Sequence, residues 1–114
     1  MASEFINYKQ KSLFEEISNS GELVFACGPN GISANIVGEF SVRYYPDKKE
    51  HRLEMGTGDQ HIHIDWNRVK IVEYSVFHGE GVLIFKDGDE VLFKLYRMDG
   101  EFSDKARQFA GPLI

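Results

Sequence analysis

Hydrophobic positions at the start of the chain recur with the period of an amphipathic helix. The positions spaced by three or four residues are Ile6, Gln10, Leu13 and Ile17, all apolar except Gln10, with Phe5 and Phe14 beside them. Side chains at such intervals share one face of a helix, so the stripe predicts a helix that packs on the rest of the domain. Ser3 can cap its start, and Gly21 stands just beyond its end. Ser12 with Glu15 also fits a capping box, which predicts a break or restart near Ser12.

From Gly21 onward the pattern changes to short apolar or alternating runs, which are typical of β-strands. The predicted strands are ELVFAC (22–27), ISANIVG (32–38), EFSVRYY (39–45), HRLEM (51–55), QHIHID (60–65), VKIVEYSVF (69–77), VLIFK (82–86) and VLFKLYR (91–97). Turn signals such as GPNG, PDKK, GTGD, HGEG and DGDE separate them. A short helix is predicted for SDKARQFA (103–110). Helices at the ends of a run of strands predict an α+β fold, in which an antiparallel β-sheet carries an N-terminal helix and a short C-terminal helix.

The size of the chain predicts one domain spanning residues 1–114. Hydrophobic residues make up 42% of the chain, which is enough for a core. A domain of this size buries somewhat less than about 70% of its unfolded surface. A large ligand cavity would thin such a core, and pairing with a second copy would offset that loss.

The charge and the cysteine count narrow the classes of partner and compartment. The net charge of -5 argues against binding to nucleic acid or to an anionic membrane surface, because both require a basic face. No apolar run approaches the roughly 18 residues of a membrane span, and MASEFINYKQ lacks the features of a signal peptide. Cys27 is the single cysteine, so an internal disulfide is excluded. These features predict a cytoplasmic protein.

The segment GDQHIHIDW contains two of the four histidines, His61 and His63. On a strand they point to the same face, with Cα atoms about 6.6 Å apart, while Ile62 and Ile64 point to the other face. The pair fits a solvated strand face, a divalent-metal site or a haem ligand. A mononuclear metal site needs a third ligand, and the next glutamate, Glu73, stands ten residues after His63.

Motifs of common hydrolases are absent from the sequence. It contains no Gly-x-Ser-x-Gly and no His-Glu-x-x-His. Cys27 stands in the apolar run LVFACG, which indicates a small core residue rather than a nucleophile. The sequence therefore favours a non-catalytic protein.

The second half of the chain resembles a known family when it is taken as a unit. In GDQHIHIDWNRVKIVEYSVFHGEGVLIFKDGDEVLFKLYR, a histidine strand leads to a strand VKIV, a glycine turn, an aromatic–aliphatic strand, an Asp-Gly turn and a strand ending in Phe-Lys-Leu-Tyr. This order is similar to the haem-utilisation proteins of the HemS, ChuX and HutX type. The resemblance covers residues 59–97, with a weaker fit over residues 21–54.

The resemblance implies a cytoplasmic haem-binding protein with a large antiparallel sheet, in which single-copy members form a homodimer. It aligns the family histidine with His61, by the distance to Gly79, and leaves His51 as the upstream candidate. His63 would then stand at the rim of the haem or donate a hydrogen bond to the ligand. These assignments make haem the expected cofactor and His61 the expected ligand of its iron.

Larger members also carry a basic run after the last strand, and here the corresponding segment is MDGEFSDKAR. Arg43, Arg52 and Arg97 are the substitutes for pairing with haem propionates. An apolar porphyrin also needs aromatic and aliphatic walls. The candidates for these walls are Tyr44, Tyr45, Tyr74, Phe77 and Phe85.

The function predicted from the sequence is therefore haem carriage or storage in iron utilisation. Two alternatives stay open: a dimeric structural or interaction module of the same fold without haem, and a His-x-His divalent-metal protein.

Overall fold

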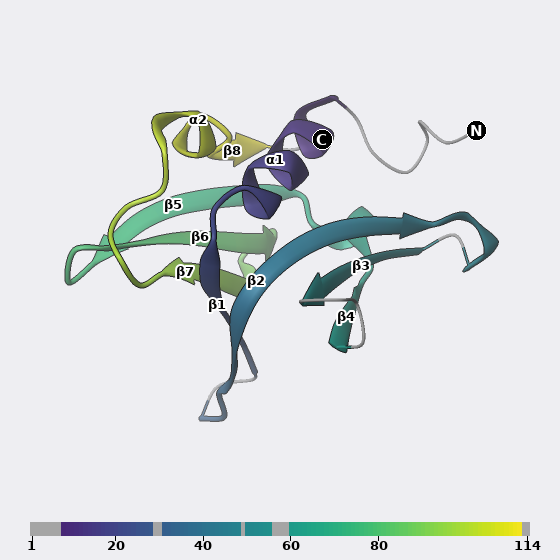
Figure 1. Cartoon of the computed structure of the whole chain (residues 1–114), viewed down its shortest axis with the longest axis horizontal. Helices are drawn as coiled ribbons and strands as arrows, with labels where there is room; N and C mark the ends of the chain where they lie inside the picture. The colour runs from purple at the N-terminus through teal and green to yellow at the C-terminus, as the bar shows by residue number, and fades with distance from the viewer. Residues whose placement is uncertain (1–7, 29–30, 49, 56–59, 113–114) are drawn as a thin grey trace.

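A single antiparallel sheet organises the protein in this computed structural model, which describes residues 8–28, 31–48, 50–55 and 60–112 (Figure 1). The strands follow the order β4-β3-β2-β1-β7-β6-β5-β8 across the sheet. Their bounds are β1 (Glu22–Cys27), β2 (Ala34–Tyr45), β3 (Glu50–Met55), β4 (Gln60–Ile64), β5 (Ile71–Phe77), β6 (Glu80–Asp87), β7 (Glu90–Arg97) and β8 (Gly111–Pro112). The helices are α1 (Tyr8–Ser18) and α2 (Asp104–Arg107), with 3₁₀ turns η2 (Pro46–Lys48) and η3 (Trp66–Arg68). The predicted sheet with an α-helix near each end is confirmed.

Helix α1 buries the apolar stripe that predicted it. Leu13, Phe14 and Ile17 are buried against the sheet. The helix continues through Ser12 without interruption, so the predicted break there is wrong. It ends before Gly21, whose φ of 75° is a conformation that glycine adopts at little cost. The predicted cap Ser3 lies outside the described residues.

Strand β2 is one continuous strand of 12 residues, which corrects the prediction of two strands divided after Gly38. Its first half pairs with β1, from Ala34 opposite Cys27 to Glu39 opposite Glu22. Its second half pairs with β3, beginning with Phe40 opposite Met55. Figure 1 shows β2 curving across the molecule, so one strand joins the β3–β4 hairpin to the rest of the sheet.

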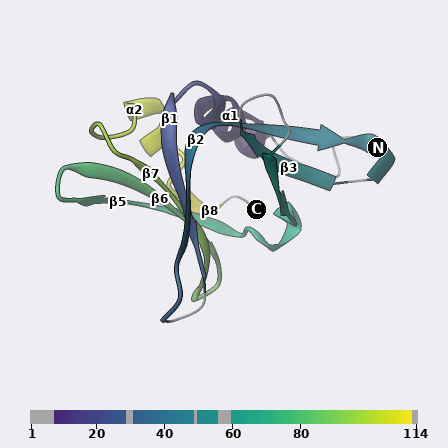
Figure 2. The same ribbon diagram turned by 60° about the horizontal axis from the view of Figure 1, so that its bottom comes forward.

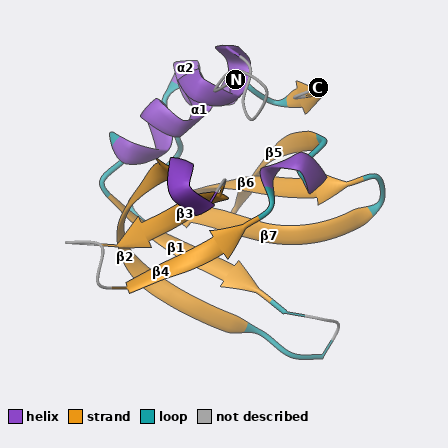
Figure 3. Cartoon of the chain, turned by 90° about the vertical axis from the view of Figure 1, so that its right-hand side faces the viewer, coloured by secondary structure: helices purple, strands orange, loops and turns teal. Residues whose placement is uncertain are grey.

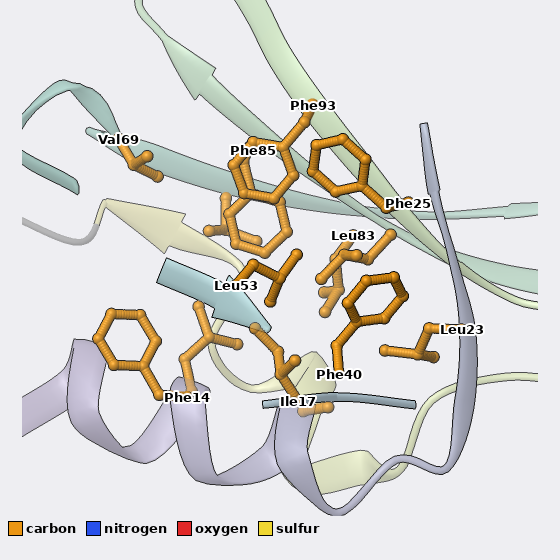
Figure 4. Packing of buried hydrophobic residues seen from close by; sticks show 14 of the residues in the cluster. Phe14, Ile17, Leu23, Phe25, Phe40, Leu53, Val69, Leu83, Phe85 and Phe93 are labelled. Atoms are coloured by element: carbon orange, nitrogen blue, oxygen red, sulfur yellow. The ribbon is translucent and has the colours of Figure 1, made fainter. Parts of the chain in front are cut away.

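The sheet curves around a hydrophobic core on its helix-bearing face. Phe85 stacks on Phe93 with ring centroids 4.3 Å apart, and Phe93 stacks on Phe25 at 5.2 Å. Leu53 of β3 is 1% exposed and belongs to the same cluster, although several strands separate β3 from β6 in the sheet. Figure 4 shows α1 beside this cluster, with Phe14 and Ile17 directed into it. The core therefore holds the β3–β4 hairpin against the other half of the sheet.

The C-terminal segment closes one end of the core. Ser103 caps α2 by accepting a hydrogen bond from the amide of Ala106, at 3.1 Å. The helix spans four residues, fewer than predicted, and Phe102 and Ala106 are buried. Figure 3 shows α1 and α2 on the same side of the sheet. Among the described helices, none is long and apolar enough to cross a membrane.

Candidate functional site

The two histidines of β4 lie together on the outer face of the sheet. Both His61 and His63 are exposed, and their ring centroids are 4.9 Å apart. Ile62 and Ile64 are partly buried and pack against the core. The predicted division of this strand into an imidazole face and an apolar face is confirmed.

Strand register brings charged side chains of β2 and β3 beside the histidines. Arg52 stands opposite His63, and Glu54 stands opposite His61. Arg43 of β2 stands opposite Arg52. Directly opposite residues of an antiparallel pair share one face, with Cβ atoms about 5 Å apart. Three neighbouring strands thus place these five side chains on one surface.

Close contacts connect Glu54 to its neighbours on this surface. The Tyr45 hydroxyl donates a hydrogen bond to Glu54 Oε2, and Arg43 Nε lies 3.4 Å from Glu54 Oε1. The guanidinium carbon of Arg52 lies 4.5 Å from the centroid of the Tyr45 ring, which is a cation–π contact. Glu54 is 3% exposed and Arg52 8%, whereas the side chain of Arg43 is 68% exposed. We call Arg43, Tyr45, Arg52, Glu54, His61 and His63 the β2–β4 polar cluster.

Sequence reasoning missed Glu54 as a member of this site. Its position two residues after Arg52 places both side chains on the same face of β3. That signal becomes specific only when the register of β3 against β2 and β4 is known. Glu54 matters because a nearly buried carboxylate needs partners, and Arg43 and Tyr45 provide them.

The cluster combines two kinds of ligand-binding group. Imidazole nitrogens bind transition metals, and guanidinium groups bind carboxylates. Within the described residues, no three His, Cys, Asp or Glu side chains are grouped to hold a metal ion. The divalent-metal interpretation therefore gains no support from the described part of the chain.

No described contact brings three further predicted site residues, His51, Arg97 and Tyr74, to the cluster. The backbone of His51 pairs with Tyr44 and Ile64, and its side chain lies outside the described part of the structure. Arg97 is at the end of β7, where its Nε lies 2.8 Å from Asp99 Oδ1 and lowers the pKa of that carboxyl group. Strands β3, β2 and β1 separate β7 from β4 in the sheet.

Tyr74 belongs to the C-terminal end of the core instead. It lies on β5, where its ring meets that of Phe102 edge to face at 6.3 Å. Burial raises the pKa of the Tyr74 phenol, and its hydroxyl lies 3.5 Å from Glu101 Oε1. The expected wall residue Phe85 is fully buried in the core, whereas Phe77 is 55% exposed. Tyr45 is therefore the one expected wall residue that the described contacts place in the cluster.

Two solved structures share this architecture. A crystal structure of ChuX superposes with a TM-score of 0.59 and 14% sequence identity over 89% of this chain and 67% of its own. A crystal structure of a protein from Erwinia carotovora gives a TM-score of 0.61 at the same identity and coverage. No protein-family profile and no curated protein sequence matches the chain significantly. The protein therefore has the fold of ChuX, and its predicted resemblance to the HemS, ChuX and HutX type is confirmed at the level of the fold.

Proposed function

We propose that the protein binds haem for carriage or storage in iron utilisation, with His61 as the axial ligand of the iron. The observation that supports this best is the exposed histidine pair beside two arginines, on a fold shared with ChuX. Neutral imidazole is a standard axial ligand of haem iron. Guanidinium groups bind carboxylates such as the haem propionates through paired hydrogen bonds. One surface thus offers both kinds of group that a haem requires.

The geometry of the pair divides the roles of the two histidines. Rings that lie 4.9 Å apart on one strand face cannot bind opposite faces of the same iron. In the proposal, His61 binds the iron and His63 lies at the rim. Arg43 is the propionate partner, because its side chain is mostly exposed. Arg52 is nearly buried and packs on the Tyr45 ring, so in the proposal it holds that ring in place and does not bind a propionate.

The proposal includes a homodimer in the cytoplasm. A porphyrin is a large apolar plate, and ligand sites usually bury most of such a surface. A haem bound on the outer face of β4 would leave its second face in water unless another copy covered it. Light scattering at micromolar concentration is expected to give about twice the chain mass of 13.1 kDa. A monomeric mass at high concentration would remove this part of the proposal.

A haem titration tests the proposal directly. Purified protein is mixed with increasing haem, and the expected result is a shifted Soret band that saturates at a fixed stoichiometry. The variant His61→Ala is expected to weaken binding and change the coordination spectrum. The matched control is His78→Asn, in the β5–β6 turn, because asparagine tolerates the φ of 51° that His78 adopts. Equal haem binding by the wild type and both variants would exclude His61 as the ligand.

One observation favours the alternative of an interaction module without haem. Glu54 already has Arg43 and Tyr45 as partners, so part of the cluster is satisfied internally and can serve the fold alone. The same titration separates the two functions, since a module of this kind gives no saturable Soret shift. Elemental analysis of the purified protein tests the divalent-metal alternative, which requires stoichiometric metal.

A further inference from the structure

A β-bulge interrupts the ladder between β6 and β7 near one end of the sheet. Between β6 and β7 the register shifts, since Phe85 stands opposite Phe93 while the next residue, Lys86, stands opposite Val91. Leu92 is therefore the extra residue. A bulge bends and twists its strand, and the described pairing of β7 with β1 ends nearby, at Ala26 opposite Lys94.

A pocket of about 250 Å³ lies where the two strands separate. Figure 2 shows the β1–β2 and β6–β7 hairpins extending toward the same end of the molecule. The pocket wall has apolar contributions from both hairpins, among them Ile32, Val91, Leu92 and Phe93. Ile32 is 67% exposed and Val91 is 47% exposed. Large apolar side chains that remain open to water around a cavity favour an apolar ligand.

Two polar side chains that have no partner among the described residues complete the wall. Lys94 and Tyr96 both line the pocket and lie two residues apart on β7, on the same face. Both are only partly exposed, and neither side chain has a hydrogen-bond or ion-pair partner within the described residues. Lys86, by contrast, is paired with Glu73 at 3.1 Å. An ammonium group and a phenol that have no side-chain partner in the described part of the chain, and that stand beside apolar side chains, favour a ligand that brings an anion.

The immediate surroundings of these groups are aliphatic. Lys94 stands between Ala26 of β1 and Ile84 of β6. Tyr96 stands between Val24 and Val82 in the same way. No carboxylate of the described residues pairs with Lys94, so an incoming anion meets no internal competitor there.

We propose that this pocket binds a small amphiphilic carboxylate, such as a medium-chain fatty acid. Its hydrocarbon body packs among Ile32, Val91 and Leu92, and its carboxylate accepts hydrogen bonds from Lys94 Nζ and Tyr96 Oη. The volume lies below the roughly 300–1,000 Å³ of pockets for drug-sized ligands, which favours a molecule much smaller than a porphyrin. Strands β2 and β3 separate the pocket strands from β4, so this site is independent of the proposed haem site.

Calorimetric titration with decanoate and with decanol tests the need for the carboxylate. Decanoate below its micellar concentration is expected to bind at one site, and decanol at least about tenfold more weakly, because it lacks the charge that strengthens the hydrogen bonds. Lys94→Gln should weaken decanoate binding by about tenfold and leave decanol unchanged. The matched control is Lys105→Gln on α2, which makes the same charge change outside the pocket. Equal weakening by both variants, or equal affinity for both ligands, would overturn the proposal.

The single cysteine gives a second measurement that needs no change in charge. Cys27 lines the pocket and is partly exposed, so bound decanoate should slow its reaction with a thiol reagent. Ser33→Phe should block the pocket from its exposed rim, where the Ser33 hydroxyl makes only a 3.4 Å hydrogen bond with Asn35. Undiminished decanoate binding in this variant, no protection of Cys27, or displacement of decanoate by one equivalent of haem would each overturn the separate pocket.

Discussion

The hydroxyl group of Tyr74 lies so close to Gly81 that a Cβ atom added to this glycine would stand 2.6 Å from it. The same Cβ would also lie 2.9 Å from the amide nitrogen of Phe102 and 3.0 Å from the Cα atom of Glu101. The missing side chain lets the C-terminal segment cross β6 at contact distance, where the Gly81 amide donates a 2.8 Å hydrogen bond to the Gly100 carbonyl. The absence of a side chain at Gly81 thus allows the C-terminal segment to pack closely against β6.

Gly81→Ala is expected to destabilise the protein by about 1–3 kcal/mol, as overpacking of a tight contact does. Urea unfolding monitored by circular dichroism measures the loss. Adding Tyr74→Phe removes the closest clashing atom but leaves the two backbone atoms in place, so the double variant should recover only part of the stability. An unchanged unfolding midpoint in Gly81→Ala would contradict the close approach.

Leu53→Ala should cost about 2–5 kcal/mol, because Leu53 is 1% exposed and packs the β3–β4 hairpin into the shared core. Val37→Ala is the matched control on the same sheet: Val37 is 51% exposed, so its truncation should change stability by less than about 0.5 kcal/mol. The measurement is again the urea midpoint. Similar losses in both variants would mean that the hairpin does not depend on the core.

Asp99 provides a test of local electrostatics. The hydrogen bond from Arg97 lowers the pKa of Asp99, so this pair stabilises the fold above the ordinary Asp pKa of about 3.9. The contribution is lost as the pH falls through the lower folded value, and it is small because Asp99 is exposed. In an NMR titration of the carboxyl carbons, Arg97→Gln should raise the pKa of Asp99 toward the ordinary value. Arg68→Gln, which removes partners of Asp87 and Glu90, should leave it unchanged.

Haem affinity should decrease as the pH is lowered from about 8 to 5. An imidazole nitrogen binds iron only when it carries no proton, so protons compete with the iron for the proposed ligand His61. Circular dichroism on the same samples separates this loss from acid unfolding. Constant affinity in a folded protein over this range would exclude histidine ligation and favour a tyrosinate or purely hydrophobic site.

The strands were predictable because their signals are local. The run ELVFAC matches β1 at both ends, and the Asp-Gly turn before Asp89 correctly separates β6 from β7. The glycine at position 38 misled the sequence interpretation, since a glycine often marks a break. In the structure Gly38 pairs with Leu23 inside β2, where the strand passes from one ladder to the next. Tertiary pairing on both sides of the strand overrode the local signal.

The composition of the site was less predictable because it depends on strand order. Alternation alone placed His61 and His63 on one face. Arg43 and Arg52 join them only because β2, β3 and β4 are neighbours. The local sequence around Arg97 and Tyr74 suits a binding site equally well. The order of the strands excludes them, and the periodicity of the sequence does not predict that β1 lies between β2 and β7.

The short β1–β7 ladder also has a consequence for the order of folding. In the described sheet, β1–β4 and β5–β7 each form a meander of sequential hairpins, and only this ladder joins the two. It consists of three residue pairs, among them Val24 with Tyr96, which is 72 residues later in the chain. Local hairpins close small loops, whereas this contact must close a long one. We therefore expect the two meanders to form first, and we expect Val24→Ala to accelerate unfolding without slowing folding. A slower folding rate in this variant would show that the β1–β7 ladder belongs to the folding nucleus instead.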